Sequence, residues 1–377
     1  MYAKSLKRLA GIAATTVFST LLALGAIEAG LRLLYLPDPW TVRNFSVDAV
    51  NQQVTNLAIQ YDPVLGYVTR EDYRGGINSH GRMGVRLNQT LKPGDPLPPI
   101  PQGGILATGD SFTFGSEVAD SQSWPSRLEA KLGVSVVNGG AGGYGIDQAI
   151  LRAEQLLDVV QPRAIIVSFI PNNVGRNEYS INQGLIKPYF DVKNGKLVLE
   201  GVPVPDYQPS RKYAGWARTA FGRSYLVYWV AERLGLRSKW LLYEGEVRVA
   251  HNHGVEVSCL LWGRLAEKVR DRDIKLIALA QYAGIQINGH DNSREYYKVP
   301  YILDCAKQAG YLVVDSYPEL RRRFEADEAA FWRNWVRQPH DEGRIWNTGH
   351  MSAEGNQLTT DLLAAVLLEK MPKMVAP

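Results

Sequence analysis

Four short segments carry side chains that could act together in chemistry. The first, Gly109-Asp110-Ser111, follows the apolar run Ile105 to Ala107. A small residue and an aspartate that can bond its own backbone allow a sharp turn there. A serine at the C-terminal tip of a strand, with a helix to follow, is where an open α/β sheet places its reactive groups. We therefore expect Ser111 to be a nucleophile, although such residues also cap turns without any chemical role.

The second segment is the loop Asn138-Gly-Gly-Ala-Gly-Gly-Tyr-Gly145, after the next apolar run. Glycines do not shield the backbone, so the N–H groups of this loop can approach a ligand closely. The loop lacks the Lys-Ser/Thr ending of a P-loop, and it is not a G-x-G-x-x-G motif that opens the first βαβ unit. We expect it to offer a backbone N–H group to an oxyanion rather than to hold a phosphate.

The third and fourth segments supply a side-chain amide and a base. Asn172, in Ile170-Pro-Asn-Asn-Val174, is a neutral N–H donor at an expected strand end, although turns alone also favour asparagine. His350 lies just before the last expected helix, for which Ser352 is the candidate N-cap. A lone loop histidine has little meaning. Grouped with a serine, a glycine amide and an asparagine, it indicates a reactive site.

In this order the four segments resemble the SGNH (GDSL-type) hydrolases, a flavodoxin-like family of serine esterases and acyl-group enzymes. Gly109-Asp110-Ser111 resembles the nucleophile block, Asn138-x-Gly140-x-x-Gly143 the glycine block, Asn172 the asparagine block and His350 the histidine block. The resemblance covers about 103 to 175 and 345 to 357. The N-terminal segment, with Glu28-Ala-Gly-Leu-Arg32, also resembles membrane-anchored bacterial members.

The resemblance implies a role for each of these residues. Ser111 would be the nucleophile and His350 its general base. The Ser111 amide, the Gly143 amide and the Asn172 side chain would hold the oxyanion, although a glycine next to Gly143 could donate instead. In the second half of the reaction, His350 would activate water, or a sugar hydroxyl if the enzyme is a transferase.

Two positions depart from the family pattern. Asn347 stands three residues before His350, where the family usually has aspartate. A neutral amide can orient the imidazole but cannot stabilise the imidazolium by charge. Asp341 or Glu354 could replace the aspartate, or a Ser-His dyad could suffice. The residue after Asn172 is Asn173 instead of the usual aspartate, which we expect to affect loop support more than chemistry.

Strands and helices alternate from residue 103, which predicts an α/β fold with a parallel sheet covered by helices on both faces. This is the flavodoxin-like three-layer arrangement that the resemblance also implies. The expected strands are 105–107, 134–137, 164–170, 275–280 and 311–314. The expected helices are 122–132, 146–159, 258–271, 294–309 and one from Ala353.

The N-terminus carries a candidate transmembrane helix. Residues 9 to 27 have no charged side chain, and at about 1.5 Å per residue they could cross a bilayer core. Lys4, Lys7 and Arg8 precede them, so the N-terminus is expected to stay in the cytoplasm with the bulk of the chain outside. A cleaved signal peptide and a buried soluble helix are the alternatives. We expect a single-pass protein of the bacterial inner membrane, or a secreted one if the segment is cleaved.

Two further segments flank or interrupt the hydrolase-like region of 103–371. Residues 38 to 102 are rich in Pro, Gly, Asn and Asp and read as a wrapping segment and linker. Residues 176 to 257 form an aromatic-rich insertion without strand–helix alternation. These aromatics could build a lid or a sugar platform, or the small core that a long excursion needs. The stretch Tyr225 to Tyr243 could also rest on a membrane surface.

Composition excludes some classes of function. A net charge of +4 is too small to argue for nucleic acid. His251 and His253 are poorly spaced as metal ligands, and we expect no metal and no cofactor. The two cysteines, Cys259 and Cys305, are expected to be buried free thiols, with a disulfide as the alternative.

These observations favour an extracytoplasmic serine esterase or deacetylase that acts on acyl esters of a carbohydrate or a related small ester. An O-acyltransferase that modifies a surface or exported polysaccharide would use the same residues. A non-catalytic glycan-binding protein on a hydrolase fold is the third possibility, supported only by Asn347.

Overall fold

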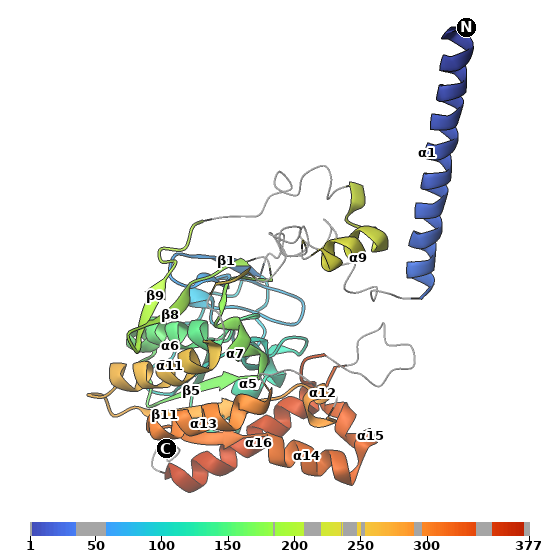
Figure 1. Ribbon diagram of the computed structural model, residues 1–377. Coiled ribbons are helices and arrows are strands. Elements are labelled where there is room, and N and C mark those ends of the chain that lie inside the picture. Colours follow the sequence, from blue (N-terminus) through green and yellow to red (C-terminus); the bar gives the residue numbers. More distant parts are fainter. Residues whose placement is uncertain are drawn as a thin grey trace. The chain divides into compact units, whose positions relative to one another are not determined.

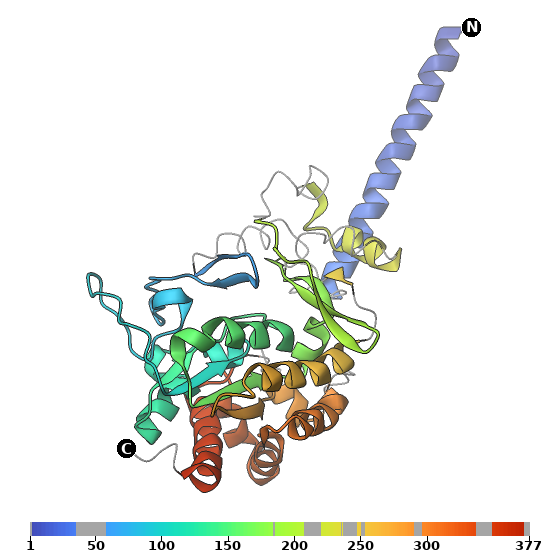
Figure 2. The same ribbon diagram turned by 90° about the vertical axis from the view of Figure 1, so that its left-hand side faces the viewer.

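The computed structural model describes residues 2–34, 58–183, 185–206, 220–234, 236, 247–249, 253–289, 296–336 and 349–372. These residues form two compact units, which Figures 1 and 2 draw in the colours of the sequence. One unit takes its residues from 1–56, 183–185 and 207–247, and the other from the rest of the chain. The domain boundaries expected from the sequence stay predictions.

A five-stranded parallel sheet forms the centre of the larger unit. Its strands are β3 (Ile105–Thr108), β4 (Val136–Asn138), β5 (Ala164–Phe169), β11 (Lys275–Ala280) and β12 (Leu312–Asp315). They lie in the order β12-β11-β5-β3-β4, and every neighbouring pair is parallel. Counted along the chain this is the order 2-1-3-4-5, which defines the flavodoxin-like fold. The expected fold class is confirmed.

Helices cover both faces of this sheet because both faces of each strand are apolar. Leu106 and Ile165 pack in a cluster that includes apolar residues of three long helices, and their chain neighbours Ile105 and Ile166 pack in a second cluster that includes apolar residues of two others. Figure 2 shows the resulting layers. The first three helices are α6 (Ile146–Val160), α11 (Gly254–Lys268) and α13 (Val299–Gln308), and the other two are α5 (Trp124–Leu132) and α16 (Ala353–Lys370).

Most of the expected strands and helices occur within a few residues of their expected bounds, and one of the larger shifts has a tertiary cause. The helix expected from 258 begins instead at Gly254. Its first N–H group donates to Glu178 Oε1 at 2.9 Å, a cap from a distant segment. A cap of this kind satisfies a terminal N–H group but leaves no local sequence signal.

The remaining elements of the larger unit are short. Two antiparallel hairpins are formed by β1 (Ile59–Asp62) with β2 (Gly66–Thr69), and by β8 (Tyr189–Lys193) with β9 (Lys196–Glu200). The others are η1 (Arg82–Gly84), α4 (Ser111–Phe114), η2 (Asp120–Gln122), α7 (Asn172–Arg176), β6 (Tyr179–Asn182), α12 (Gly284–Ile287), η3 (Tyr296–Lys298), α14 (Tyr317–Ala326), α15 (Glu328–Phe331) and η4 (Trp332–Asn334). The smaller unit contains α1 (Tyr2–Leu33) and α9 (Tyr225–Arg233).

The aromatic-rich insertion expected at 176 to 257 is divided between the two units. Its first part packs on the hydrolase-like core, where Phe190 is fully buried and Val192 and Leu199 lie against the same cluster. Its later part belongs to the smaller unit, where Tyr225 and Tyr228 form a small apolar cluster of their own. The insertion therefore contributes residues to both units.

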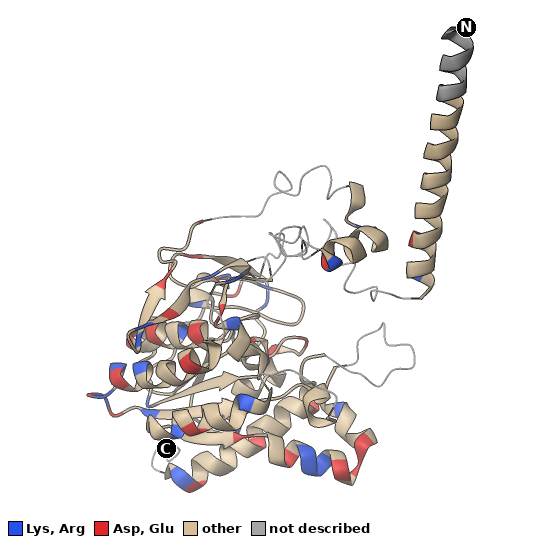
Figure 3. Ribbon diagram, viewed as in Figure 1, with Lys and Arg blue, Asp and Glu red and all other residues tan. Residues whose placement is uncertain are grey.

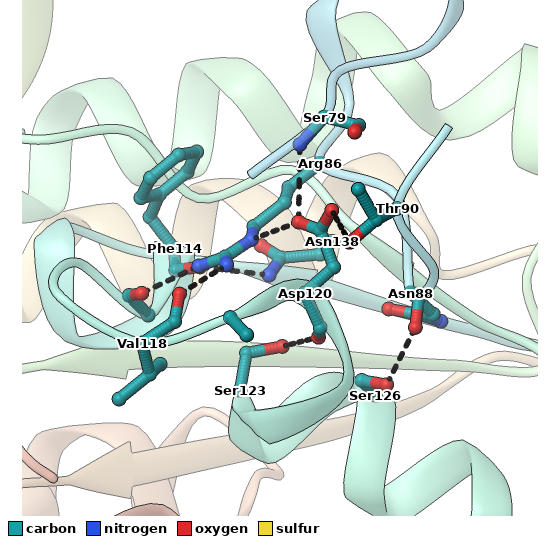
Figure 4. A network of polar contacts seen from close by, with 12 residues as sticks. Ser79, Arg86, Asn88, Thr90, Phe114, Val118, Asp120, Ser123, Ser126 and Asn138 are labelled. Atoms are coloured by element: carbon teal, nitrogen blue, oxygen red, sulfur yellow. Dashed lines mark hydrogen bonds and ion pairs between the residues drawn. The ribbon is translucent and has the colours of Figure 1, made fainter. Parts of the chain in front are cut away.

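The segment expected to wrap the domain contributes a buried cation, Arg86 (Figure 4). Its Nε donates to Asp120 Oδ1 at 3.0 Å, and both side chains are fully buried. Its terminal nitrogens donate to the carbonyl oxygens of Phe114 at 2.6 Å and Val118 at 2.7 Å. A buried guanidinium with several satisfied donors fixes the backbone that it contacts. Arg86 thus fixes the loop that follows Ser111.

The expectation of free thiols at Cys259 and Cys305 is wrong. The two residues form a disulfide between α11 and α13, with Cα atoms 5.2 Å apart. Both positions are only partly buried, on facing sides of two helices that pack together. The apolar pattern of each helix gave no sign of this pairing, because it depends on the contact between the helices.

The buried side chain of His80 should make the stability of the fold depend on pH. The side chain is fully buried, its Nδ1 lies 3.0 Å from the Arg70 carbonyl oxygen, and burial lowers its pKa to about 4. The unfolded chain takes up this proton near pH 6.5 and the folded chain only near 4, so stability falls as the pH falls between these values, by up to about 3 kcal/mol. Urea unfolding from pH 7 to 4 should show a shallower loss for His80→Gln than for the natural chain. Parallel curves would contradict this.

Candidate active site

Ser111 is the first residue of α4, directly after β3, and its position is set by Asp110. The Asp110 side chain caps the helix by accepting a hydrogen bond from Phe112 N at 2.9 Å. Its other oxygen accepts from Asn173 Nδ2 at 3.0 Å and from Arg176 at 3.1 Å. This buried carboxylate therefore joins the turn that holds Ser111 to the start of α7.

The turn before Ser111 requires a glycine. A Cβ atom at Gly109 would lie 2.6 Å from the Ser168 carbonyl oxygen and 2.2 Å from Thr113 Oγ1. Contacts this short with backbone atoms cannot be relieved by rotating a side chain. Gly109 thus lets the chain reverse against β5 and deliver Ser111 to the edge of the sheet.

The glycine loop packs against the same turn. Ala141 N donates to the Gly109 carbonyl oxygen at 3.0 Å, and a Cβ at Gly140 would lie 2.5 Å from Phe114 N. Gly143 has a positive φ of 79°, and its carbonyl oxygen accepts from Asn182 Nδ2 at 2.6 Å. Among the described residues, neither the Ser111 N–H nor the Gly143 N–H donates to a protein acceptor. Both groups are free to bind an oxyanion.

The two asparagines after β5, Asn172 and Asn173, differ in exposure and in the groups that they bind. Asn172 is exposed, and its Oδ1 accepts from Gln286 Nε2 at 3.2 Å. This hydrogen bond orients the amide so that its Nδ2 is the group that can donate to a ligand. Asn173 is buried and supports the loops, because its Nδ2 also donates to the Tyr144 carbonyl oxygen at 2.8 Å. This agrees with the support role expected for Asn173.

His350 lies against the nucleophile turn. Its ring centroid is 5.5 Å from that of Phe112, the residue after Ser111. Ser352 caps α16 by accepting from Gly355 N, as its sequence position suggested. The histidine block is therefore brought to the serine block across more than two hundred residues of chain.

The carboxylate beside His350 is one that sequence reasoning missed, Glu117. Its Oε2 accepts from the backbone N–H of His350 at 3.1 Å and lies 3.3 Å from His350 Nδ1, at ion-pair distance but without hydrogen-bond geometry. Glu117 has a positive φ of 70° and lies in the loop that Arg86 holds through Val118. A non-glycine residue in this conformation persists only where its surroundings fix it. The one available signal was an acidic residue six positions after Ser111.

The other candidates for the third member of the site have different outcomes. Asn347 and Asp341 lie outside the described residues. Glu354 is turned to Arg333, whose Nε lies 3.3 Å from its Oε2. Of the three alternatives weighed on the sequence, none is placed beside His350 within the described chain.

A buried ion pair lies behind the glycine loop. Lys187 and Asp147 are both fully buried and in contact, and Lys187 Nζ also donates to the Pro188 carbonyl oxygen at 2.8 Å. Burial raises the pKa of Asp147 and lowers that of Lys187, and each partner opposes the shift of the other. The pair joins the start of α6, directly after Gly145, to the segment that enters β8.

Replacing Lys187 with methionine should destabilise the fold by about 3 kcal/mol or more, because Asp147 would be left buried without its cation. Urea unfolding of the purified chain measures this. Lys193→Met, an exposed lysine in the β8–β9 hairpin, is the matched control and should change stability little. Asp147→Asn added to Lys187→Met should recover part of the loss, and no recovery would show that the pair is not its cause.

No group of three or more His, Cys, Asp or Glu side chains that could hold a metal ion occurs in the described part of the chain. The groups gathered at the sheet edge are a hydroxyl, an imidazole, a carboxylate and N–H donors. Such a set suits nucleophilic attack on a carbonyl carbon followed by stabilisation of an oxyanion.

No family model matches the chain, and no curated protein matches its sequence. Solved structures are similar to it at low identity. An alpha/beta hydrolase enzyme from the metagenome of Lake Arreo, Spain, is 14% identical, with a TM-score of 0.40 over 70% of this chain and 95% of the other. A lipase/acylhydrolase from Enterococcus faecalis is 10% identical, with a TM-score of 0.40 over 71% and 97%. A catalytic mutant of an acetylxylan esterase from Geobacillus stearothermophilus is 13% identical, with a TM-score of 0.39 over 71% and 94%.

Proposed function

We propose that this chain, which has the flavodoxin-like fold of the SGNH hydrolases, is a serine esterase that cleaves acyl esters through an acyl-enzyme. One observation carries the proposal. The segments at the C-terminal edge of one parallel sheet carry Ser111, two unengaged backbone N–H groups, the Asn172 amide and a His350–Glu117 pair. Ligands of open α/β sheets bind at this edge.

Each group has a step in the proposed reaction. His350 Nε2 takes the proton of Ser111 as Oγ attacks the ester carbon, and the Glu117 carboxylate, 3.3 Å from Nδ1, stabilises the imidazolium by its charge. The N–H groups of Ser111 and Gly143 and the amide of Asn172 bind the oxyanion. The intermediate collapses, and His350 returns the proton to the leaving alkoxide. Water then attacks the acyl-enzyme, with His350 again as base, and releases the acid and Ser111.

We propose that the ester is carried by a carbohydrate or a related small alcohol outside the cytoplasm. The aromatic-rich stretch of 176–257 supplies tyrosine and tryptophan side chains of the kind that stack on sugar rings. A sugar hydroxyl in place of water would make the same site an O-acyltransferase. The presence of a carboxylate at His350 speaks against a decayed, non-catalytic site.

The proposed location is a bacterial inner membrane, with α1 as a retained anchor. The segment Ala10–Leu33 of α1 is long and apolar enough to cross a membrane, and none of its residues is buried. A signal sequence would have the same properties. Figure 3 shows the charged residues of this helix only near its C-terminal end within the described side chains. The Cys259–Cys305 disulfide supports an oxidising compartment for the rest of the chain.

The test is acetate release by the full chain in lipid nanodiscs, with p-nitrophenyl acetate and acetylated xylan as substrates. Ser111→Ala is the control. We expect release from both substrates by the natural chain and a rate lower by about 10⁶-fold in the variant. If acetate is instead transferred to added unacetylated oligosaccharide, the transferase is correct. Equal release by natural chain and variant would refute the proposal.

A further inference from the structure

The smaller unit is held together by a carboxylate near the end of α1. Glu28 accepts hydrogen bonds from Ser224 Oγ at 2.8 Å, Tyr225 N at 3.0 Å and Leu226 N at 2.8 Å. These N–H groups belong to the first turn of α9, where a helix favours negative charge. Arg32, one turn further along α1, donates to the Arg223 carbonyl oxygen at 2.8 Å. The start of α9 is therefore fixed to the C-terminal end of α1.

The helix α9 is apolar on two faces, and the described residues cover only one of them. Tyr225, Tyr228 and Ala231 are buried and pack with Leu31 of α1. On the opposite side are Leu226, Trp229, Val230 and Leu234, which we call the apolar stripe. Spacings of three and four residues place them on one side of a helix. Trp229 is 38% exposed, Val230 39% and Leu234 65%.

We propose that α9 lies at the surface of the membrane that α1 spans, with the apolar stripe in the boundary between headgroups and acyl chains. The inference rests on the proposed anchor and goes beyond it, since it concerns a second, non-spanning helix. Glu28 and Arg32 are the first charged residues after the uncharged run of α1, so they mark where α1 leaves the hydrocarbon. The helix that they hold therefore begins at the level of the headgroups.

The side chains of the stripe suit this level. Trp229 has an apolar ring with a polar N–H, the type of side chain enriched at membrane interfaces. The Arg233 guanidinium lies 4.6 Å from the centre of the Trp229 ring, where its charge can reach phosphate while its stem stays apolar. Figure 3 shows charged residues at the C-terminal end of α9 and none at its start. A helix with an exposed apolar side of this kind lies in the interface plane.

The same contacts bear on whether α1 is cleaved. Cleavage beyond Leu31 would take away Glu28 and Leu31, which leaves three donors at the start of α9 without their acceptor and its buried face without cover. Unsatisfied terminal N–H groups and an uncovered apolar face both cost stability. The contacts thus favour a retained anchor.

The chain suits a fluorescence test, because both of its cysteines are in the disulfide and a third cysteine can be labelled alone. Val230→Cys in the stripe, Glu232→Cys on the other side of α9 and Val17→Cys in α1 would each carry an environment-sensitive nitrobenzoxadiazole label. The full chain is placed in nanodiscs that contain lipids with nitroxides either near the glycerol or deep in the acyl chains. Urea unfolding of each variant checks that it folds.

We expect shallow nitroxides to quench the label at 230 strongly, deep nitroxides to quench the label at 17, and neither to quench the label at 232. The expected depth of the stripe is roughly 5–10 Å into the boundary. If the label at 17 is quenched while that at 230 behaves like that at 232, the inference about α9 is wrong and the anchor stands. If neither 17 nor 230 is quenched, both have failed.

Discussion

Ser111→Ala should lower kcat for acyl-ester hydrolysis by about 10⁶-fold, the scale seen when a serine triad loses its nucleophile. The acyl-enzyme route requires this hydroxyl, and the neighbouring groups can only hold the substrate and its oxyanion. Residual hydrolysis above the uncatalysed rate should remain, because the N–H groups of Ser111 and Gly143 are backbone atoms and survive the substitution. Steady-state hydrolysis of p-nitrophenyl acetate measures the loss.

The matched control is Ser116→Ala, in the loop that follows α4. Ser116 is half-buried, and its N–H donates to the Ser111 carbonyl oxygen through the backbone, which alanine preserves. It should keep activity within a few-fold of the natural chain. A loss at Ser116 comparable to that at Ser111 would mean that the loop, and not the hydroxyl, is at issue.

Glu117→Gln should lower kcat by around 10⁴-fold with little change in KM, by analogy with loss of the acid in other serine triads. Glutamine keeps the size of the side chain and an oxygen that can accept from the backbone N–H of His350. It removes the charge that stabilises the imidazolium, and its amide can favour the wrong tautomer. Glu117→Asp should recover part of the loss if the carboxylate reaches Nδ1.

Glu354→Gln separates this assignment from the alternative that the sequence offered. Glu354 lies at the start of α16 and contacts Arg333, so its replacement by glutamine should change kcat little. If Glu354→Gln is the damaging change and Glu117→Gln is not, the third member of the site has been assigned to the wrong carboxylate.

The sheet could be predicted from the sequence because each strand has a recognisable local sequence pattern. Ile105 to Ala107 and Lys275 to Ala280 are apolar runs bounded by polar or small residues, and such runs separated by helices imply parallel order. Bounds were less certain where a distant group decides them, as with Glu178 at the start of α11. The disulfide was missed for the same reason, because it depends on how α11 packs on α13.

The site was predictable only in part. Ser111, Gly143, Asn172 and His350 follow a linear pattern of blocks, so their convergence could be expected once the parallel sheet was in hand. Glu117 belongs to no block. It reaches His350 because its loop is held by Arg86, and that contact joins residues with no shared sequence pattern.

The central claim is that Ser111 is a nucleophile activated by His350, and intact-mass analysis after fluorophosphonate treatment tests it most directly. The full chain in nanodiscs should gain the mass of one adduct, mapped to Ser111 by peptide sequencing. Ser111→Ala should gain none, and His350→Ala should react far more slowly. A folded natural chain that gains no adduct, or one that gains it elsewhere, would contradict the account.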